Sequence, residues 1–139
     1  MKRKKKEYVN CETEGLDTKL PPIECFGNQF KSYTITTVIP EYTSLCPKTG
    51  QPDFGTVTIE YEPDRSIIEL KSLKLYVQAY RNIGIFYENA INRILEDVVK
   101  ACKPEWCMVK GEFSARGGIK STIEARYPRK TKKANSRKF

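Results

Sequence analysis

The chain has 139 residues, of which 39% are hydrophobic and 30% charged, and it carries a formal net charge of +8 without any histidine. That length supports one domain with its own core and is short for two ordinary domains. Because no stretch approaches the roughly 20 apolar residues of a membrane-spanning helix, and no apolar segment follows the basic start, we expect a cytoplasmic protein and no membrane partner.

The positive charge is concentrated at the two ends of the chain. Residues 2–6 and 126–139 contain twelve of the 25 basic residues, whereas residues 7–125 contain thirteen basic and all 17 acidic residues, a net charge of −4. Both ends lack apolar periodicity, so solvated, disordered ends are the simplest interpretation. A weak, salt-dependent attraction to RNA is the alternative. We expect no specific nucleic-acid partner, because the body of the chain is acidic.

Two strands are predicted in the first half of the chain, after an irregular segment that ends near Gly27. Residues 29–39 are rich in Tyr, Thr, Ile and Val, and residues 55–61 alternate in hydrophobicity, as half-buried strands do. Pro40 is predicted to end the first strand. Residues 40–53 contain three prolines and one glycine, so they are predicted to form a loop, and loops of this length are commonly functional.

Two helices are predicted next. Apolar residues at helical spacing run from Leu70 to Tyr80, and residues 86–102 carry an apolar stripe that is typical of a helix packed on a core. Residues 105–114 and 118–127 are predicted to be two further strands. The pattern therefore predicts an α+β fold with the order ββααββ.

This order predicts a four-stranded antiparallel sheet with two helices on one face. Such a subunit leaves sheet edges and a second sheet face open to solvent, and open edges favour association. Subunits joined edge to edge would close into a barrel, so we expect a homo-oligomer.

Five cysteines at irregular spacing do not resemble a secreted disulfide framework, so reduced thiols are expected. The lack of histidine excludes Ser-His and Cys-His catalytic pairs and makes a zinc site a poor fit. We therefore expect no catalytic metal, and any activated nucleophile must depend on other neighbours.

Cys46 differs from the other cysteines because it lies in the predicted loop, directly before Pro47 and close to Lys48. A nearby cation lowers the pKa of a thiol, and the thiolate is the attacking species. Asp53 lies at the other end of the same loop, where a carboxyl kept neutral by an apolar site could donate a proton. The plainer alternatives are a small buried residue for Cys46 and a turn residue for Asp53.

Residues 69–76 have the sequence ELKSLKLY, which taken alone is typical of an exposed helix face. This octapeptide resembles the signature of the QueF family, the 7-cyano-7-deazaguanine reductases, at every position. The resemblance runs from about residue 25 to residue 127, in the short single-domain form of the family. It implies the tunnelling fold (T-fold), whose subunits form oligomeric barrels with active sites at subunit interfaces.

The resemblance also implies an activity. The family reduces the nitrile of 7-cyano-7-deazaguanine to 7-aminomethyl-7-deazaguanine, an intermediate of queuosine biosynthesis and hence of tRNA modification. Cys46 matches the nucleophile that forms a thioimide with the nitrile, and Asp53 matches the proton donor. Two molecules of NADPH per turnover would act as co-substrates.

The remaining site residues follow from the same resemblance. The residues expected to bind substrate are Ile68, Glu69, Leu70, Tyr87 and Glu88. The residues expected to bind NADPH are Lys71, Ser72, Lys74 and Arg116. Tyr87 departs from the family, in which histidine usually precedes this glutamate; tyrosine can stack or hydrogen-bond, but it does not carry protons as imidazole does near pH 7.

Three segments are expected: residues 1–24, irregular with a basic start; residues 25–127, the reductase domain; and residues 128–139, a basic disordered tail. Two other functions were weighed against reduction. A relative similar to GTP cyclohydrolase I would share the fold, but it depends on zinc held by Cys and His. A small basic RNA-binding module without catalysis is the alternative from a different class, supported by the aromatic content and the basic ends.

Overall fold

The computed structural model describes residues 11–129, so the predicted basic start and the predicted tail beyond Arg129 lie outside the described residues. Within this range the elements are β1 (Cys25–Gly27), β2 (Ile35–Leu45), β3 (Pro52–Glu62), β4 (Ser66–Ile68), α1 (Leu70–Gln78), the 3-10 helix η2 (Ala79–Asn82), α2 (Tyr87–Cys102), β5 (Trp106–Phe113) and β6 (Thr122–Tyr127). No helix in the described part of the chain is both long enough and apolar enough to cross a membrane.

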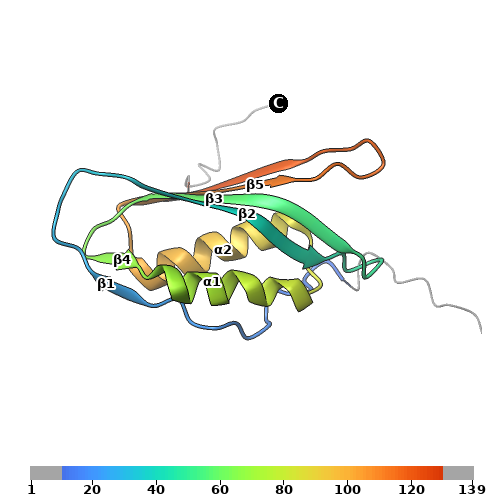
Figure 1. Cartoon of the computed structure of the whole chain (residues 1–139), viewed down its shortest axis with the longest axis horizontal. Helices are drawn as coiled ribbons and strands as arrows, with labels where there is room; N and C mark the ends of the chain where they lie inside the picture. Colours follow the sequence, from blue (N-terminus) through green and yellow to red (C-terminus); the bar gives the residue numbers. More distant parts are fainter. Residues whose placement is uncertain (1–10, 130–139) are drawn as a thin grey trace, which may run out of the picture.

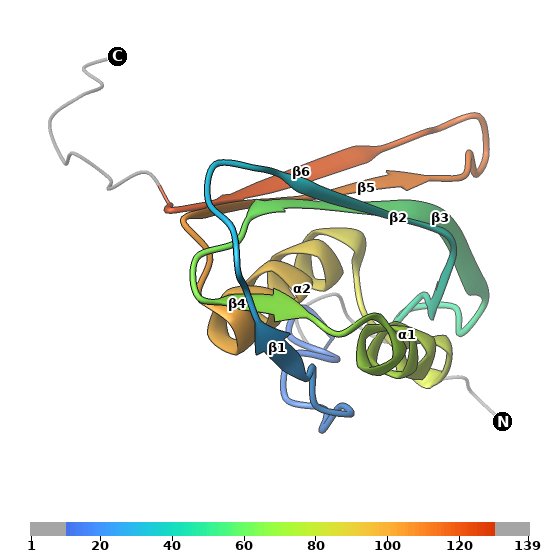
Figure 2. The ribbon, with the colours of Figure 1, turned by 60° about the vertical axis from the view of Figure 1, so that its left-hand side comes forward.

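Four strands form an antiparallel sheet in the order β2-β3-β5-β6, and both helices lie on one of its faces (Figure 1). This confirms the predicted α+β architecture. A second sheet pairs β1 with β4 beside the start of α1 (Figure 2). The sequence did not predict this sheet, because strands of three residues are too short to show an alternating pattern.

The first long strand differs from the prediction at both ends. β2 starts at Ile35 and continues through Pro40 to Leu45, so the prediction that Pro40 ends the strand is wrong. The pairing of β2 with β3 shifts between Ile39 and Tyr42. Proline is tolerated here because β2 is an edge strand and the irregularity interrupts the ladder, so the missing N–H costs no hydrogen bond.

The predicted loop over residues 40–53 is therefore much too long. The connection between β2 and β3 covers residues 46–51, and Asp53 lies on β3, paired with Ser44 of β2. Alternation resumes after Pro40 with its phase shifted by one residue, since Ile35, Thr37 and Ile39 are the less exposed residues before it and Tyr42 and Ser44 are buried after it. The prolines were given more weight than this alternation.

The predicted apolar stripe of α2 is confirmed. Its buried face consists of Ala90, Ile91, Ile94, Leu95, Val98 and Cys102. Burying one Ile or Leu side chain contributes about 1.5–3 kcal/mol, so this face anchors the helix on the sheet. The helix ends at Cys102, and the capping residue Lys103 adopts a left-handed φ of 46° before Pro104.

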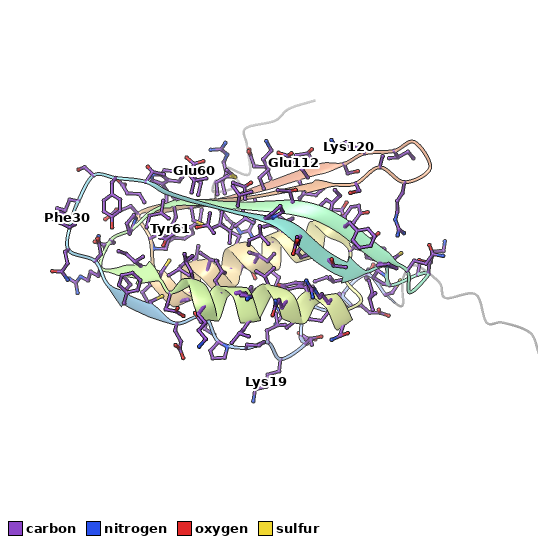
Figure 3. All side chains as sticks on the ribbon, viewed as in Figure 1. Lys19, Phe30, Glu60, Tyr61, Glu112 and Lys120 are labelled. Atoms are coloured by element: carbon purple, nitrogen blue, oxygen red, sulfur yellow. The ribbon has the colours of Figure 1, made fainter. Side chains whose placement is uncertain are left out.

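Tyrosines are unusually prominent in the layer between the sheet and the helices. Those exposed by 2% or less are Tyr42, Tyr61, Tyr76 and Tyr80. Figure 3 shows Tyr61 on the helix side of the sheet, whereas Glu60 and Glu112 project from the opposite face. A buried tyrosine hydroxyl normally has a hydrogen-bond partner, and that of Tyr61 accepts the N–H of Ile68 at 3.0 Å.

The segment before β1 packs on the start of α2. The guanidinium of Arg93 donates to the carbonyls of Gly15 and Thr18, and the amide of Asn89 donates to the carbonyl of Glu12 at 2.6 Å. Gly15 has a φ of +84°, and a Cβ there would lie 2.7 Å from Ile85. Residues 11–18 are therefore fixed against the connection that leads into α2.

Candidate active site

The turn between β2 and β3 holds Cys46 by its own backbone. The N–H of Cys46 donates to the carbonyl of Gln51, and the carbonyl of Cys46 accepts the N–H of Gly50, both at 2.8 Å. Gly50 has a φ of +72°, a conformation that glycine adopts without steric cost. The thiol is half-buried at this turn.

The surroundings of Cys46 favour its thiolate. Burial raises the pKa of this thiol, but hydrogen bonds from the Thr49 side chain and from the backbone of Thr49 and Lys48 lower it, and the net shift is downward. The predicted help from Lys48 therefore comes through its backbone. The negative charge of Asp53 opposes the shift, because the carboxyl lies close to the thiol.

Asp53 is buried, with 5% of its surface exposed, and its carboxylate has two partners. Arg116 places Nη1 3.3 Å from Oδ1 of Asp53, and the hydroxyl of Tyr87 donates to the same oxygen at 3.1 Å. Cys46 and Asp53 therefore lie on the two sides of one short turn. The carboxylate of Asp53 contacts the phenol of Tyr87 and the guanidinium of Arg116.

A short stretch of parallel pairing brings the start of α2 to this turn. The N–H of Leu45 donates to the carbonyl of Ile83 at 2.9 Å, and the N–H of Ile85 donates to the carbonyl of Leu45 at 3.0 Å. Tyr87, the first residue of α2, stacks on Phe113 with ring centroids 3.8 Å apart and an interplanar angle of 7°. Burial, followed by the charge of Asp53, raises the pKa of Tyr87.

Arg116 reaches the site from the loop between β5 and β6. Its guanidinium also donates to the carbonyl of Pro52, so it contacts two consecutive residues of β3. Arg116 was predicted to bind a cofactor phosphate; in this structure its charge lies on the carboxylate of Asp53. Its side chain is 40% exposed and therefore accessible to a ligand as well.

Glu88 lies one residue beyond Tyr87, in the first turn of α2, and its side chain is exposed. Among residues 11–129 its carboxylate has neither a hydrogen bond nor an ion pair. An exposed carboxylate without a partner among the described residues is available to accept hydrogen bonds from a ligand.

The signature residues form a second group, at the start of α1. The carboxylate of Glu69 caps this helix, accepting the N–H groups of Lys71 at 2.8 Å and Ser72 at 2.7 Å, and these bonds lower the pKa of Glu69. The hydroxyl of Ser72 accepts the N–H of Glu24 at 2.9 Å and donates to the carbonyl of Glu69 at 2.8 Å.

The two groups lie at opposite ends of α1. The helix starts beside β4 and ends on the side of the β2–β3 turn (Figure 1), and its nine residues span about 13 Å at 1.5 Å per residue. Ile68, Glu69 and Leu70 are at the far end from Cys46. The structure thus brings Cys46 and Asp53 together. Within the same chain, Ile68, Glu69 and Leu70 lie away from this pair, at the other end of α1.

A groove of about 340 Å³ runs between β2 and α1. Its walls are mainly apolar, from Ile39, Leu73 and Val77, and its cations are Lys74 and Arg81. Lys71 and Lys74 are both exposed on α1. Within residues 11–129, no group of three or more His, Cys, Asp and Glu side chains is arranged to hold a metal ion.

Comparisons with known proteins identify the family of the chain. The family model described as "QueF-like protein" matches residues 52–132. The chain belongs to the QueF family. This confirms the resemblance that the octapeptide at residues 69–76 indicated, since the octapeptide lies inside the matched range.

Two relatives match more than three quarters of the chain. The NADPH-dependent 7-cyano-7-deazaguanine reductase of Elusimicrobium minutum is 56% identical over 118 residues, which is 84% of this chain and 89% of the relative. The protein of the same name from Chlorobaculum tepidum is 57% identical over 107 residues, 76% of this chain and 92% of the relative. These matches strengthen the assignment to the family.

A solved structure shares the fold. The crystal structure of the archaeosine synthase QueF-Like in the apo form superposes with a TM-score of 0.62 at 24% identity, covering 71% of this chain and 95% of that one. At this level of identity the likeness concerns the arrangement of helices and strands alone.

Proposed function

We propose that this protein is an NADPH-dependent nitrile reductase that converts 7-cyano-7-deazaguanine to 7-aminomethyl-7-deazaguanine in queuosine biosynthesis. The observation that supports this most strongly is the turn that places a thiol of lowered pKa and a buried carboxyl together, at Cys46 and Asp53. Relatives that are 56% and 57% identical to this chain carry the name of that activity.

The reaction would begin on the sulfur of Cys46. The thiolate adds to the nitrile carbon while Asp53 gives a proton to the nitrile nitrogen, which forms a thioimide without any metal. NADPH, when bound, would supply hydride to this carbon, and two molecules of NADPH would be used in each turnover. After the first hydride the C–S bond breaks, and Cys46 leaves as thiolate from the resulting imine.

Tyr87 would position the proton donor. Its hydroxyl bonds to Asp53 and its ring is fixed on Phe113, so the carboxyl is held against the thiol. Orienting Asp53 needs only a hydrogen bond, which a tyrosine supplies as well as the histidine usual in the family.

Substrate recognition would use residues of two subunits. Glu88, which follows Tyr87 in the first turn of α2, would offer a carboxylate to the ring NH and amino groups of the deazaguanine. Ile68, Glu69 and Leu70 would complete the pocket from a neighbouring subunit, because the length of α1 separates them from Cys46 within one chain.

The open sheet edges support assembly. β2 and β6 are the two edges of the four-stranded sheet, and exposed edges favour pairing with another chain. We therefore propose a homo-oligomer in which T-fold subunits join edge to edge into a barrel with active sites at their interfaces.

The residues present fit an elongated anionic cofactor. Lys71 and Lys74 carry exposed ammonium groups at the start of α1, and Lys74 lines the apolar groove along β2. Arg116 adds a guanidinium at the catalytic turn. Ser72 is buried and already hydrogen-bonded, so we propose that it shapes the start of the helix between the two lysines.

The boundaries of the reductase domain at residues 25 and 127, and the cytoplasmic location, stay predictions. Arg129 lies in the predicted tail, and it donates to Asn92 and Glu96 on α2. The first part of that segment is therefore in contact with the domain.

The proposal is tested by intact-mass measurement of the protein mixed with 7-cyano-7-deazaguanine in the absence of NADPH. We expect an adduct of one substrate mass on the wild type and on Cys25→Ala, a matched control at a half-buried thiol remote from the turn. Cys46→Ala should form none. If the wild type formed no adduct and oxidised no added NADPH, the reductase would be rejected in favour of an RNA-binding module.

A further inference from the structure

The N-terminal segment (residues 11–18) lies before the expected start of the reductase domain at residue 25, yet it has a defined structure. The N–H of Glu14 donates to the carbonyl of Cys11 at 3.1 Å, and the N–H of Leu16 donates to the carbonyl of Thr13 at 3.2 Å. Cys11 is 1% exposed. These residues therefore form consecutive turns that pack on the rest of the molecule.

The N-terminal segment packs directly on the connection that leads into α2 (residues 83–86). A Cβ on Gly15 would lie 2.7 Å from Cβ of Ile85 and 2.9 Å from the carbonyl oxygen of Gly84. No side chain of residue 15 therefore separates the backbone of the segment from the backbone of the connection.

The same connection touches the catalytic turn. A Cβ on Gly84 would lie 3.7 Å from Cα of Pro47, the residue after Cys46, and 3.0 Å from Oε2 of Glu14 in the N-terminal segment. Gly84 therefore lies between the N-terminal segment and the turn that holds Cys46.

The connection also joins the thiol to the proton donor. Leu45, directly before Cys46, exchanges two hydrogen bonds with it, at 2.9 and 3.0 Å. Tyr87, directly after the connection, donates to Oδ1 of Asp53 at 3.1 Å. A shift of the connection would therefore move Cys46 and Asp53 relative to each other.

Arg93 of α2 fixes the N-terminal segment in place. Its guanidinium donates to the carbonyls of Gly15 and Thr18, and its Nε lies 3.4 Å from Oδ2 of Asp97. The side chain of Arg93 is only 13% exposed. A guanidinium has five N–H donors in a rigid fork, so it bonds three acceptors at once, which an ammonium group does not do with the same geometry.

A plain cover over the core is the simpler role for this segment, but its composition does not suit that role. Leu16 is its one large apolar side chain, and Leu16 is 38% exposed. The segment is held by hydrogen bonds from Arg93 and from Asn89, whose amide donates to the carbonyl of Glu12 at 2.6 Å. Because hydrogen bonds are directional, they fix where the segment lies.

We propose that Arg93 is a positioning residue for the addition of the thiolate to the nitrile, an inference that rests on the proposed reductase function. Through residues 11–18 and the connection, Arg93 holds Tyr87 and Asp53 in line with Cys46. Misplacing a reacting group by about 1 Å costs about 100-fold in rate, so a support in contact with the catalytic turn affects the chemistry. The active site then depends on residues before residue 25.

The first variant is Arg93→Ala, mixed with 7-cyano-7-deazaguanine in the absence of NADPH. Adduct formation, followed by intact mass, should slow by about tenfold or more, because the thiol and the proton donor are no longer aligned. Alkylation of Cys46 by iodoacetamide needs no proton donor. Its pH midpoint should stay at the wild-type value, because Thr49 and Lys48 of the turn itself lower the pKa of this thiol. Arg93→Lys should recover part of the lost rate of adduct formation.

Gly15→Ala tests the same segment from its other side. The new Cβ would clash with Ile85, and a φ of +84° is strained for alanine, so the segment should move off the connection. Adduct formation should slow as it does in Arg93→Ala. In the double variant the loss should not exceed that of the slower single variant, because both changes act through one segment, whereas the losses from independent changes would multiply.

Arg129→Ala is the matched control, since the guanidinium of Arg129 donates to Asn92 and Glu96 on the same helix. It should form the adduct at the wild-type rate. Thermal unfolding shows whether each variant keeps its fold. If Arg93→Ala does not fold, Asn89→Ala takes its place in every comparison, because it removes a single hydrogen bond to the segment.

Three results would overturn this role of Arg93. Wild-type adduct formation in folded Arg93→Ala and Gly15→Ala would mean that the segment only covers the core. A changed midpoint of alkylation would mean that the segment maintains the shape of the turn and not the alignment of Cys46 with Asp53. Losses that multiply in the double variant would mean that Arg93 does not act through the segment. A wild-type protein that forms no adduct and oxidises no NADPH would instead reject the reductase itself, which is a distinguishable outcome.

Discussion

The two ends of the helical layer place cysteine in opposite surroundings. At the β2–β3 turn, hydrogen bonds from Thr49 and Lys48 overcome partial burial and lower the pKa of Cys46. At the other end, near the last turn of α2, burial raises the pKa of Cys25, and it raises that of Cys102 and Cys107 to about 12. The same side chain is thus activated at one end and suppressed at the other.

This contrast shows what activates a thiol in a chain without histidine. Cys102 lies on the buried face of a helix, where neighbouring N–H groups are already used by the helix itself. Cys46 follows a strand and enters a tight turn, in which the backbone of Lys48 and Thr49 lowers the pKa of the sulfur. Hydrogen bonds from the Thr49 side chain and from the backbone of the turn therefore lower the pKa of this thiol, as an imidazole does in Cys-His enzymes.

The largest expected effect comes from neutralising the acid at the active end. Asp53→Asn keeps the size of the side chain but has no proton to give, so adduct formation should slow by about 100-fold or more. The rate is measured by intact mass at successive times, without NADPH.

Asp64→Asn is the control for this change, because Asp64 is an exposed residue between β3 and β4. It should react like wild type. If Asp53→Asn also reacted at the wild-type rate, Asp53 would not be the proton donor, and the pairing of thiol and carboxyl at the turn would lose its proposed meaning.

A second prediction tests whether Cys46 of one subunit and Glu69 of another subunit form one active site. Subunits with Cys46→Ala lack the nucleophile, and subunits with Glu69→Ala lack a residue from the far end of α1. If each site takes Cys46 from one subunit and Glu69 from another, co-expressed mixtures should regain about a quarter of wild-type turnover. Random assembly gives about a quarter of the sites both an intact Cys46 and an intact Glu69.

Each variant assembled alone should stay inactive, and their separately purified oligomers, mixed without exchange of subunits, should stay inactive too. Absence of recovery in co-expressed oligomers of confirmed mixed composition would mean that both ends serve one chain. The proposal of a site between subunits would then be abandoned.

The sequence predicted the features that depend on neighbouring residues better than those that depend on contacts between distant segments. The apolar period of α2 and the strands of the main sheet are local patterns, and they were predicted. Cys46 and Asp53 were placed in one loop, but Asp53 is on a strand, because proline was taken as a strand end although an edge strand tolerates it.

Contacts between distant segments left no trace in the sequence. The approach of Arg116 to Asp53 depends on how far the β5–β6 loop reaches over β3, and no spacing rule encodes that reach. The buried positions of Tyr42 and Ser44 were not predictable either, because the irregularity between Ile39 and Tyr42 shifts the alternation by one residue, and unbroken alternation would place both on the exposed face.

The smallest expected effect concerns how the turn activates its thiol. Because thiolate is the form that reacts with iodoacetamide, alkylation of Cys46 should begin at lower pH than that of an ordinary thiol and should rise as pH passes through its pKa. Thr49→Ala removes the side-chain hydrogen bond that lowers this pKa, so the midpoint of alkylation should move to higher pH. The labelled residue and its rate are followed by mass spectrometry of peptides.

Thr43→Ala is the matched control, since its hydroxyl donates to the carbonyl of Glu41 on β2 and not to the thiol. Its midpoint should equal that of wild type, and Cys102 and Cys107 should stay unlabelled in all three proteins while they are folded, because burial holds their thiols neutral. An unchanged midpoint in Thr49→Ala would show that the backbone N–H groups alone set the reactivity of Cys46. The difference between the two ends of the molecule would then lie in the shape of the turn and not in its side chains.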